Sequence, residues 1–589
     1  MKIRPVTQFY LLAVQIHLTL GAVYERIADL PSKKYDFVIV GAGAAGSVLA
    51  NRLSENTKFS VLLLEAGGSN QDALPTKIPF FCTRLSNTLY DWNYTTTPQV
   101  GLNGRSISYP RGHVLGGSTS INGMFYTRGS AEDYDRYAEV TGDAGWSWKG
   151  IQKYIRRNEI FNPPADHHNT SGQYDPSIHG LHGINSVSLP GNPQSIDGRV
   201  IQTTFDLDEF HFNQDMNSGH LLGLGWLQAT IKGGSRSSSA TSYLGSKFIN
   251  RPNLHILLNV RVTRVLSSTR DRSFRTIELA QAKGPKRLIA ARKEIILSAG
   301  TVGTPHILLN SGIGDKDELA QLGIETTHHL PDVGKNLTDH PRLASNWIVN
   351  SIGRTFDIIN QNATLTDNLI RQWEKTQIGP LVDTFASHLF FARLLGNRLP
   401  DGKDPAAGPD TPHYELGFSN GFVGATPLNG KFIAITTRVV SPTSRGLITL
   451  KSKDPLEPPL IDPGFLSTNF DILAMREAVK SAKRFLDGPA WKGYVLQPFG
   501  ALANVTTDAQ LDTYIRSGTG TSTHCTGTAS MSARNATYGV VDPDFRVKGL
   551  GGIRIIDASV LPYVPSAHTQ APVYILAERA ADLIKEDWH

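Results

Sequence analysis

The sequence predicts an α/β protein with a Rossmann-like nucleotide-binding domain and a second domain in which helices cover an antiparallel β-sheet. Near the amino terminus, an apolar strand leads through closely spaced glycines into a helix. Later in the chain, strand-like apolar runs alternate with turns rich in proline and glycine. The length of 589 residues also exceeds the roughly 250–300 residues at which a single hydrophobic core stops growing. We therefore expect at least two core-bearing regions.

The first element is a strand, turn and helix in "KKYDFVIVGAGAAGSVLANRLSE". An apolar strand over residues 37–40 turns through Gly41, Gly43 and Gly46 into a helix that ends near Leu53. Glycines at this spacing permit a tight turn, close approach of backbone to a pyrophosphate, and a helix N-terminus aimed at the phosphates. We predict a dinucleotide site here, and a purely structural glycine turn is the alternative.

A second strand, "FSVLLLEAGG", ends at Glu65. This carboxylate follows the glycine turn by about the 20 residues expected of the group that accepts ribose hydroxyls. Nicotinamide cofactors and FAD both contain an ADP moiety, and the same loop serves both. The motif therefore does not choose between them.

Composition narrows the function classes. The formal charge is +6, but no run of five or six Lys or Arg residues concentrates it, which is typical of a solvated surface. We therefore expect no nucleic-acid partner. Two cysteines, Cys82 and Cys525, provide neither a disulfide framework nor a metal-ligand cluster, so no metal site is expected.

The amino-terminal residues 1–22 are predicted to be a signal peptide. Lys2 and Arg4 precede an apolar run that ends in small residues around Gly21 and Ala22. An ordered amino-terminal helix is the alternative. No segment has the ~20 uncharged apolar residues of a membrane span, so we expect a secreted protein. Acceptor tripeptides for N-glycosylation agree with this and lie at Asn93, Asn169, Asn336, Asn362, Asn504 and Asn535.

Two long motifs carry a family resemblance. "GHVLGGSTSINGMFYTRGSAEDYD" at residues 112–135 and "GTVGTPHILLNSGIG" at 300–314 resemble the two signature patterns of the glucose–methanol–choline (GMC) family of FAD oxidoreductases. The sequence looks most similar to the fungal aryl-alcohol oxidases within that family. The resemblance covers nearly the whole chain after the leader, and further matches are "VGKNLTDH" at 333–340, "VDPDFRVKG" at 541–549 and "IRIIDASVLP" at 553–562.

The resemblance implies FAD as the cofactor. Small residues such as Gly117 and Ser118 would let backbone pass close to a flat ring system, and Asn122 would bond the polar edge of that ring. Asp557 would lie near the pyrophosphate and ribitol. The full expected cofactor-binding set is Gly41, Gly43, Gly46, Glu65, Gly117, Ser118, Asn122, Gly123, Val262, Asp557, Ala558, Thr569 and Gln570.

The resemblance also implies a discontinuous domain organisation. An FAD-binding domain is expected from residues 34–340 together with 515–589, and a substrate-binding domain from residues 341–514. The runs "KFIAITTRVVSP" and "GLITLKS" suit an antiparallel sheet over the flavin. The spacing of apolar residues over Met475–Leu486 predicts a helix.

His524 and His568 are the predicted catalytic residues, because the matching residues of the family face the reactive side of the flavin. Oxidation of an alcohol removes the hydroxyl proton while hydride leaves the carbinol carbon for flavin N5. Full transfer of that proton to an ordinary imidazole is unfavourable by roughly 12 kcal/mol. We therefore expect His524 to act as general base and His568 to hydrogen-bond the substrate oxygen. A nucleophilic pair of His524 with Cys525 is disfavoured, since adjacent residues of an extended chain point to opposite faces.

The resulting prediction is a GMC-type enzyme that oxidises a primary alcohol, aryl or allylic, to the aldehyde, with O2 or a quinone-type acceptor reoxidising the flavin. We expect a monomer. The alternatives are a hydroxynitrile-lyase-like flavoprotein on the same fold and a nicotinamide-dependent dehydrogenase. Departures from the family pattern lie at His113, at Gly123 where aryl-alcohol oxidases can carry a tyrosine, and at Thr523 and Cys525 beside His524. Fewer aromatic side chains at these positions predict a roomier or differently shaped pocket.

Overall fold

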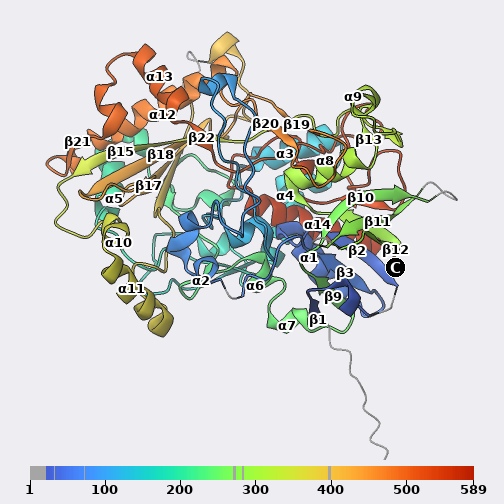
Figure 1. The fold of residues 1–589 in the computed structure, drawn as a ribbon. Helices are drawn as coiled ribbons and strands as arrows, with labels where there is room; N and C mark the ends of the chain where they lie inside the picture. Colours follow the sequence, from blue (N-terminus) through green and yellow to red (C-terminus); the bar gives the residue numbers. More distant parts are fainter. Residues whose placement is uncertain (1–21, 32–33, 72, 269–272, 282–283, 395–398) are drawn as a thin grey trace, which may run out of the picture.

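The computed structural model describes residues 22–31, 34–71, 73–268, 273–281, 284–394 and 399–589. Two large sheets form the two halves of the molecule and lie on opposite sides of the view in Figure 1. The predicted leader, residues 1–22, lies outside the described residues except for its last residue, Ala22, and so stays a prediction.

The first sheet carries the dinucleotide fold. Its strands pair in parallel from β1 to β12 and with β23, while β12, β11 and β10 are antiparallel. Every residue of β2 and β3 is buried, as expected of parallel strands covered on both faces. The order is β1 (Ala22–Tyr24), β9 (Leu254–Leu257), β3 (Val61–Leu64), β2 (Tyr35–Val40), β12 (Arg287–Leu297), β11 (Phe274–Ala280) and β10 (Arg261–Ser267), with β23 (Ile553–Ile555) paired to β12.

Helices from both ends of the chain pack on this sheet. α1 (Ala44–Ser54) begins directly after Gly43, and α14 (Gln570–Asp587) packs beside it. A buried ion pair between Arg52 and Glu578, at 2.8 Å, joins the two helices.

The bounds of β2 and α1 confirm, within two residues, the strand predicted over 37–40 and the helix predicted to end near Leu53. α8 (Gly300–Asn310) follows β12.

The second sheet is antiparallel throughout. α12 (Asn469–Leu486) packs on β17 and β18, and α13 (Asp508–Gly518) packs on α12. Figure 1 shows both helices beyond the sheet, away from the dinucleotide half. The order is β21 (Val495–Pro498), β15 (Pro341–Val349), β18 (Phe432–Val439), β17 (Tyr414–Ser419), β16 (His388–Ala392) and β6 (Gly223–Trp226), with β22 (Gly520–Thr521) paired to β15.

Two expectations about this half can be compared with the structure. "KFIAITTRVVSP" forms β18, and the helix predicted over Met475–Leu486 lies within α12. "GLITLKS" instead forms β19 (Leu447–Thr449), which pairs with β20 (Leu460–Asp462) in a separate two-stranded sheet. β6 and β22 join the second sheet although they lie outside 341–514. The expected division into domains stays a prediction.

The remaining helices and short strands complete the described structure. Among the described residues, no helix combines the length and the apolar character needed to cross a bilayer. These helices are α2 (Leu74–Lys77), α3 (Ala131–Thr141), α4 (Trp148–Asn158), α5 (Asp197–Asp206), α6 (Ser239–Ser242), α7 (Ser246–Ile249), α9 (Lys316–Gln321), α10 (Asp357–Gln361) and α11 (Ala363–Thr376). The short strands are β4 (Glu159–Phe161), β5 (Asn185–Val187), β7 (Ile231–Lys232), β8 (Ser235–Arg236), β13 (Ile313–Gly314) and β14 (His328–His329).

Candidate active site

One cavity of about 610 Å³ connects the glycine turn after β2 with the two predicted catalytic histidines. This volume lies within the range of about 300–1,000 Å³ that is typical of ligand pockets. Every predicted site residue lines the cavity except Gly46. Segments from the beginning, the middle and the end of the chain therefore meet around one space, as the sequence predicted.

The glycines form a cradle made largely of backbone. Gly41 has φ +99°, and a Cβ there would lie 2.4 Å from the Ser298 carbonyl oxygen. A Cβ on Gly117 would lie 2.8 Å from the Cα of Gly43, so two glycine loops far apart in sequence touch. Gly46 packs under the turn, because a Cβ there would lie 1.9 Å from the Gly41 oxygen. Because these glycines have no side chains, the cradle leaves room for a dinucleotide beside the N-terminus of α1. It therefore fits FAD.

Glu65 stands at the end of β3 and lines the cavity. Its Oε2 accepts a hydrogen bond from the Ala42 N–H at 3.0 Å, and its Oε1 accepts one from the Gly67 N–H at 2.9 Å. Burial nevertheless raises the pKa of Glu65 to about 7. The carboxyl group holds the turns after β2 and β3 together.

Asp557 is a buried anchor at the carboxyl end of β23. Its Oδ2 accepts from the Gly300 N–H at 2.9 Å and from Thr304 Oγ1 at 2.6 Å, and its Oδ1 accepts from the Ser559 N–H at 2.8 Å. These bonds fix the first turn of α8 beside the cavity. Burial raises the pKa of Asp557. Its neighbour Ala558 also lines the cavity.

The loop around Asn122 forms part of the cavity wall. Asn122 Oδ1 accepts from the Met124 N–H at 3.1 Å and from Arg236 Nη1 at 2.8 Å. Ser118 Oγ accepts from the Gly112 N–H at 3.1 Å. Thr569 precedes α14 and Gln570 is its first residue, and Gln570 Nε2 donates to the Phe125 carbonyl at 2.7 Å. Val262 supplies an apolar surface.

The fold brings His524 and His568 into contact. Their ring centroids lie 4.6 Å apart with an interplanar angle of 76°. His524 follows β22, and His568 immediately precedes the start of α14. The backbone N–H of His524 donates to Asp339 Oδ1 at 2.8 Å, and that of His568 donates to Thr127 Oγ1 at 2.7 Å. Both imidazoles are almost fully buried and line the cavity.

A third imidazole, His340, was not predicted. Its Nδ1 lies 3.0 Å from His524 Nδ1, so one of these nitrogens donates to the other. Burial lowers the pKa of His524 well below its usual range, and the nearby His568 and His340 lower it further. Burial also lowers the pKa of His340 to about 3. "VGKNLTDH" was recognised as a motif, but its sequence does not show that its last residue meets His524.

Glu415 and Arg438 were also missed. They face each other across β17 and β18 and form a buried ion pair. His568 Nε2 lies 3.1 Å from Glu415 Oε2. Burial favours the neutral carboxyl group, but Arg438 and His568 outweigh it and lower the pKa of Glu415 to about 2. Burial lowers the pKa of His568 despite this carboxylate. A charged residue inside each apolar strand was the available sequence signal.

The pocket beside Gly123 is not empty of aromatic rings. Phe385 lies 3.4 Å from where a Cβ on Gly123 would stand, and its ring lies 5.3 Å from that of Phe125. Phe125 in turn lies 4.7 Å from the His568 ring. Aromatic rings therefore line the pocket beside Gly123 although position 123 itself has no side chain, one from the same loop and one from a distant segment.

The residues beside His524 are not simple apolar filling of the pocket. Thr523 has φ +61°, which is uncommon for a β-branched residue. Cys525 is buried, and Arg111 Nη1 lies 3.0 Å from its Sγ. Arg111 Nη2 also donates to the Thr523 carbonyl at 2.7 Å. His113 does not line the cavity and packs against Trp92 at 4.5 Å between ring centroids.

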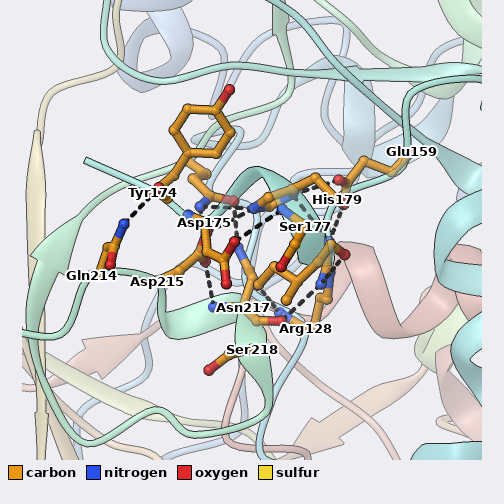
Figure 2. Close-up of polar contacts among 12 residues, drawn as sticks. Arg128, Glu159, Tyr174, Asp175, Ser177, His179, Gln214, Asp215, Asn217 and Ser218 are labelled. Atoms are coloured by element: carbon orange, nitrogen blue, oxygen red, sulfur yellow. Dashed lines mark hydrogen bonds and ion pairs between the residues drawn. The ribbon is translucent and has the colours of Figure 1, made fainter. Parts of the chain in front are cut away.

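A buried network of charges surrounds Arg128 and His179 (Figure 2). His179 Nδ1 lies 2.6 Å from Glu159 Oε1, and His179 Nε2 lies 2.8 Å from Asp215 Oδ2. Arg128 Nη2 donates to Glu159 Oε2 at 2.7 Å. The Arg128 N–H and side chain also bind Asn217. This network fixes the segment that carries Phe125 and Thr127 to the wall of the cavity.

The chain matches known proteins over nearly its whole length. Models of the GMC oxidoreductase family match residues 35–342 and 442–577. Dehydrogenase eriK of Hericium erinaceus is 42% identical over 96% of this chain and 96% of its own length. Pyranose dehydrogenase 3 of Leucoagaricus meleagris is 41% identical over 97% of this chain and 96% of its own length.

A solved structure of a fungal aryl-alcohol oxidase has the same fold. It superposes with a TM-score of 0.81 at 25% identity and covers 94% of this chain and 99% of its own. The predicted α/β architecture and the FAD cofactor are confirmed, and the protein is an oxidoreductase. Motifs, cradle and full-length similarity agree: the chain belongs to the GMC family of FAD oxidoreductases.

Proposed function

We propose that this enzyme oxidises a primary alcohol, aryl or allylic, to the aldehyde, with His524 as the general base. The observation that carries the proposal is the pair of imidazoles at one end of the cofactor cavity, with ring centroids 4.6 Å apart. The glycine cradle, Glu65 and the start of α14 would hold FAD, which when bound accepts hydride at N5. The chain's own side chains must then bind the alcohol and take its proton.

His524 is suited to take the hydroxyl proton. Its Nδ1 is engaged by His340, and Nε2 is the nitrogen left for a substrate. Its lowered pKa keeps the ring neutral at pH 7, so a lone pair is available. Because a free alkoxide lies roughly 12 kcal/mol uphill of an ordinary imidazole, proton loss must accompany hydride departure or the oxygen must be held. A positioned base typically contributes about 10²–10⁴-fold to the rate.

His568 is suited to hold the oxygen as it gains charge. Glu415 accepts from His568 Nε2, and its negative charge stabilises positive charge on the ring. While neutral, however, His568 offers only a lone pair at Nδ1. It donates to the substrate oxygen only when the ring is protonated. The neutral ring, with its proton on Nε2 and its lone pair on Nδ1, supports a second assignment. In that assignment His568, hydrogen-bonded to Glu415, is the base and His524 is the donor.

The flat part of the substrate would lie on Phe125 and Phe385. These rings line the cavity beside His568 and make a tilted pair with centroids 5.3 Å apart. An aryl or allylic group suits such a surface. A pyranose is the second candidate substrate, because one similar protein is named pyranose dehydrogenase.

Electron acceptor and location belong to the same proposal. We favour a quinone-type acceptor over O2, since the two similar proteins are named dehydrogenases. We place the enzyme outside the cell on the strength of the predicted leader and the glycosylation tripeptides. Among those asparagines, Asn336 uses its amide in bonds to Ser530 and Pro562, whereas Asn93 and Asn169 are exposed.

Anaerobic titration tests the reaction itself. The purified yellow holoenzyme is mixed without oxygen with a benzylic alcohol, an allylic alcohol or glucose. Bleaching of the flavin absorbance with formation of one aldehyde per flavin is expected for the first two. Bleaching by glucose alone would transfer the assignment to sugars. No bleaching by any alcohol, with cleavage of a cyanohydrin, would replace it with lyase chemistry. Peroxide release in air compared with reduction of a quinone dye then identifies the acceptor.

Asparagine substitutions separate the two histidine roles. An asparagine side chain donates a hydrogen bond but cannot accept a proton as a base. If His524 is the base, His524→Asn slows single-turnover flavin reduction by about 10²–10⁴-fold, while His568→Asn slows it far less. The reverse order would assign the base to His568. Both variants must retain flavin absorbance, which shows that the cradle is intact.

A further inference from the structure

Arg342 is a charged residue at the substrate end of the cavity. It is the second residue of β15, and its partners in register are Arg438 on β18 and Gly520 on β22. It follows His340 by two residues. Arg342 lines the same cavity as His524 and His568 and keeps part of its surface accessible there.

A row of three charges crosses the sheet at this point. Arg342 faces Arg438, and Arg438 faces Glu415 on β17. Glu415 forms its ion pair with Arg438 and accepts from His568, so it neutralises Arg438 rather than Arg342. Among the described residues, no carboxylate lies within ion-pair distance of Arg342 and no protein group accepts a hydrogen bond from its side chain. The guanidinium of Arg342 is therefore the charge that is left without a partner among the described residues.

The rest of the lining does not supply that partner. The described acidic residues of the cavity are Glu65 and Asp557, and both belong to the cofactor end. Burial, together with Arg438, lowers the pKa of Arg342 to about 10, so the guanidinium is still charged at neutral pH. A second polar group is also unmatched: the buried Ser522 hydroxyl lines the cavity and has no hydrogen-bond partner among the described residues.

Removing a charge from water is unfavourable unless an opposite charge meets it. We propose that the substrate carries a carboxylate, which pairs with the Arg342 guanidinium while the carbinol group lies at the two histidines. A carboxylate matches the planar fork of an arginine and accepts two parallel hydrogen bonds. The Ser522 hydroxyl is a further donor in the same cavity. This inference rests on the proposed alcohol oxidation and specifies its substrate class as hydroxy acids.

Matched substrates test the pairing. Reduction of the holoenzyme flavin is measured with 4-(hydroxymethyl)benzoate and with its uncharged methyl ester, and the ratio of their kcat/KM values is compared between variants. Wild type should prefer the acid. Arg342→Gln should lower the acid-to-ester ratio by about 10- to 100-fold, the value of a hydrogen bond to a charged group. Arg342→Lys should recover part of it. Arg354→Gln removes an exposed arginine shortly after β15 and should leave the ratio unchanged.

A binding measurement separates this inference from the proposed function. Benzoate, which cannot be oxidised at a carbinol carbon, is titrated into the oxidised holoenzyme while the flavin spectrum is followed. Binding about 10- to 100-fold weaker in Arg342→Gln supports the carboxylate site even if no alcohol bleaches the flavin. Bleaching by the ester with an acid-to-ester ratio equal in wild type and Arg342→Gln would overturn the inference and leave the alcohol oxidation standing. An altered flavin potential with an unaltered ratio would assign Arg342 to the cofactor and also overturn it.

Discussion

The two imidazoles of the cavity are uncharged at neutral pH, because burial lowers the pKa of each below its ordinary value. A base of this kind is active above its pKa. The rate of flavin reduction by a benzylic alcohol should therefore stay constant from pH 7 to pH 9 and begin to fall only at a pH well below the ordinary histidine pKa of about 6.5. Anaerobic stopped-flow measurements across this range provide the test. A rise in rate with a midpoint above pH 7 would show that a neutral His524 is not the limiting base.

Gly117 shows how one missing methyl group shapes the cofactor site. Gly117→Ala would place a Cβ 2.8 Å from the Cα of Gly43 and should destabilise the cradle by about 1–3 kcal/mol. The purified variant should contain less FAD per chain than wild type. Gly104→Ala is the matched control, because Gly104 also has positive φ but has open space around it. Equal FAD loss in both variants would attribute the effect to backbone strain and not to the cradle.

At the scale of elements, the segment between Gly123 and α3 links the cavity to the buried charge network. Thr127 accepts from the His568 N–H, and the Phe125 carbonyl accepts from Gln570. The next residue, Arg128, enters the network with Glu159 (Figure 2). The position of His568 therefore depends on charges that do not line the cavity.

His179 is the central residue of that network. Burial alone would lower its pKa, but Asp215 and Glu159 outweigh burial and raise it. His179→Ala would leave two buried carboxylates with Arg128 as their one cation among the described network residues. We expect a loss of about 3–5 kcal/mol in the free energy of unfolding, measured with urea. The exposed His220→Ala should change it by less than about 0.5 kcal/mol. If His179→Ala also changed the free energy of unfolding by less than about 0.5 kcal/mol, the network would not stabilise the fold.

At the scale of the molecule, buried neutral histidines make the fold sensitive to acid. Burial lowers the pKa of His306 to about 4 and those of His340 and His388 to about 3. The unfolded chain takes up these protons near pH 6.5, before the folded chain does. Their stabilisation is thus complete above about pH 6.5 and is lost as the pH falls, at about 1.4 kcal/mol per pH unit for each group.

Urea unfolding of the holoenzyme between pH 7 and pH 4.5 measures this loss. These three histidines lower the stability as the pH falls below 6.5, whereas a buried carboxyl group with a raised pKa, such as Glu65, acts in the opposite direction. The informative quantity is therefore the difference in stability between a variant and wild type. His388→Gln should gain stability relative to wild type by about 1.4 kcal/mol per pH unit as the pH falls below 6.5, whereas the exposed His220→Gln should show no such change. His179 acts in the opposite window, because its raised pKa gives stability that is present below pH 6.5 and lost as the pH rises. A stability difference between His388→Gln and wild type that is the same at pH 7 and pH 4.5 would contradict the assignment.

The sequence predicted the features whose signal is local. The glycine turn, the helix after it and Glu65 lie close together in the chain, and their spacing alone indicates a nucleotide site. His524 and His568 came from the family resemblance and not from spacing. Glu415 and Arg438 could not be placed, since their meeting depends on the register of β17 and β18. Phe385 was also missed, because only the fold brings this residue beside Gly123 and Phe125.

The ion pair between Arg52 on α1 and Glu578 on α14 has a consequence for biosynthesis. α1 leaves the ribosome among the first described elements, and α14 is the last. The surface of α1 that packs on α14 therefore stays uncovered until α14 has been made. Thr569 and Gln570, which line the cavity, also join it only at that stage, so the cofactor site is complete only late in synthesis. A nascent chain that stalls before α14 would be a target for chaperones and not a partly loaded enzyme.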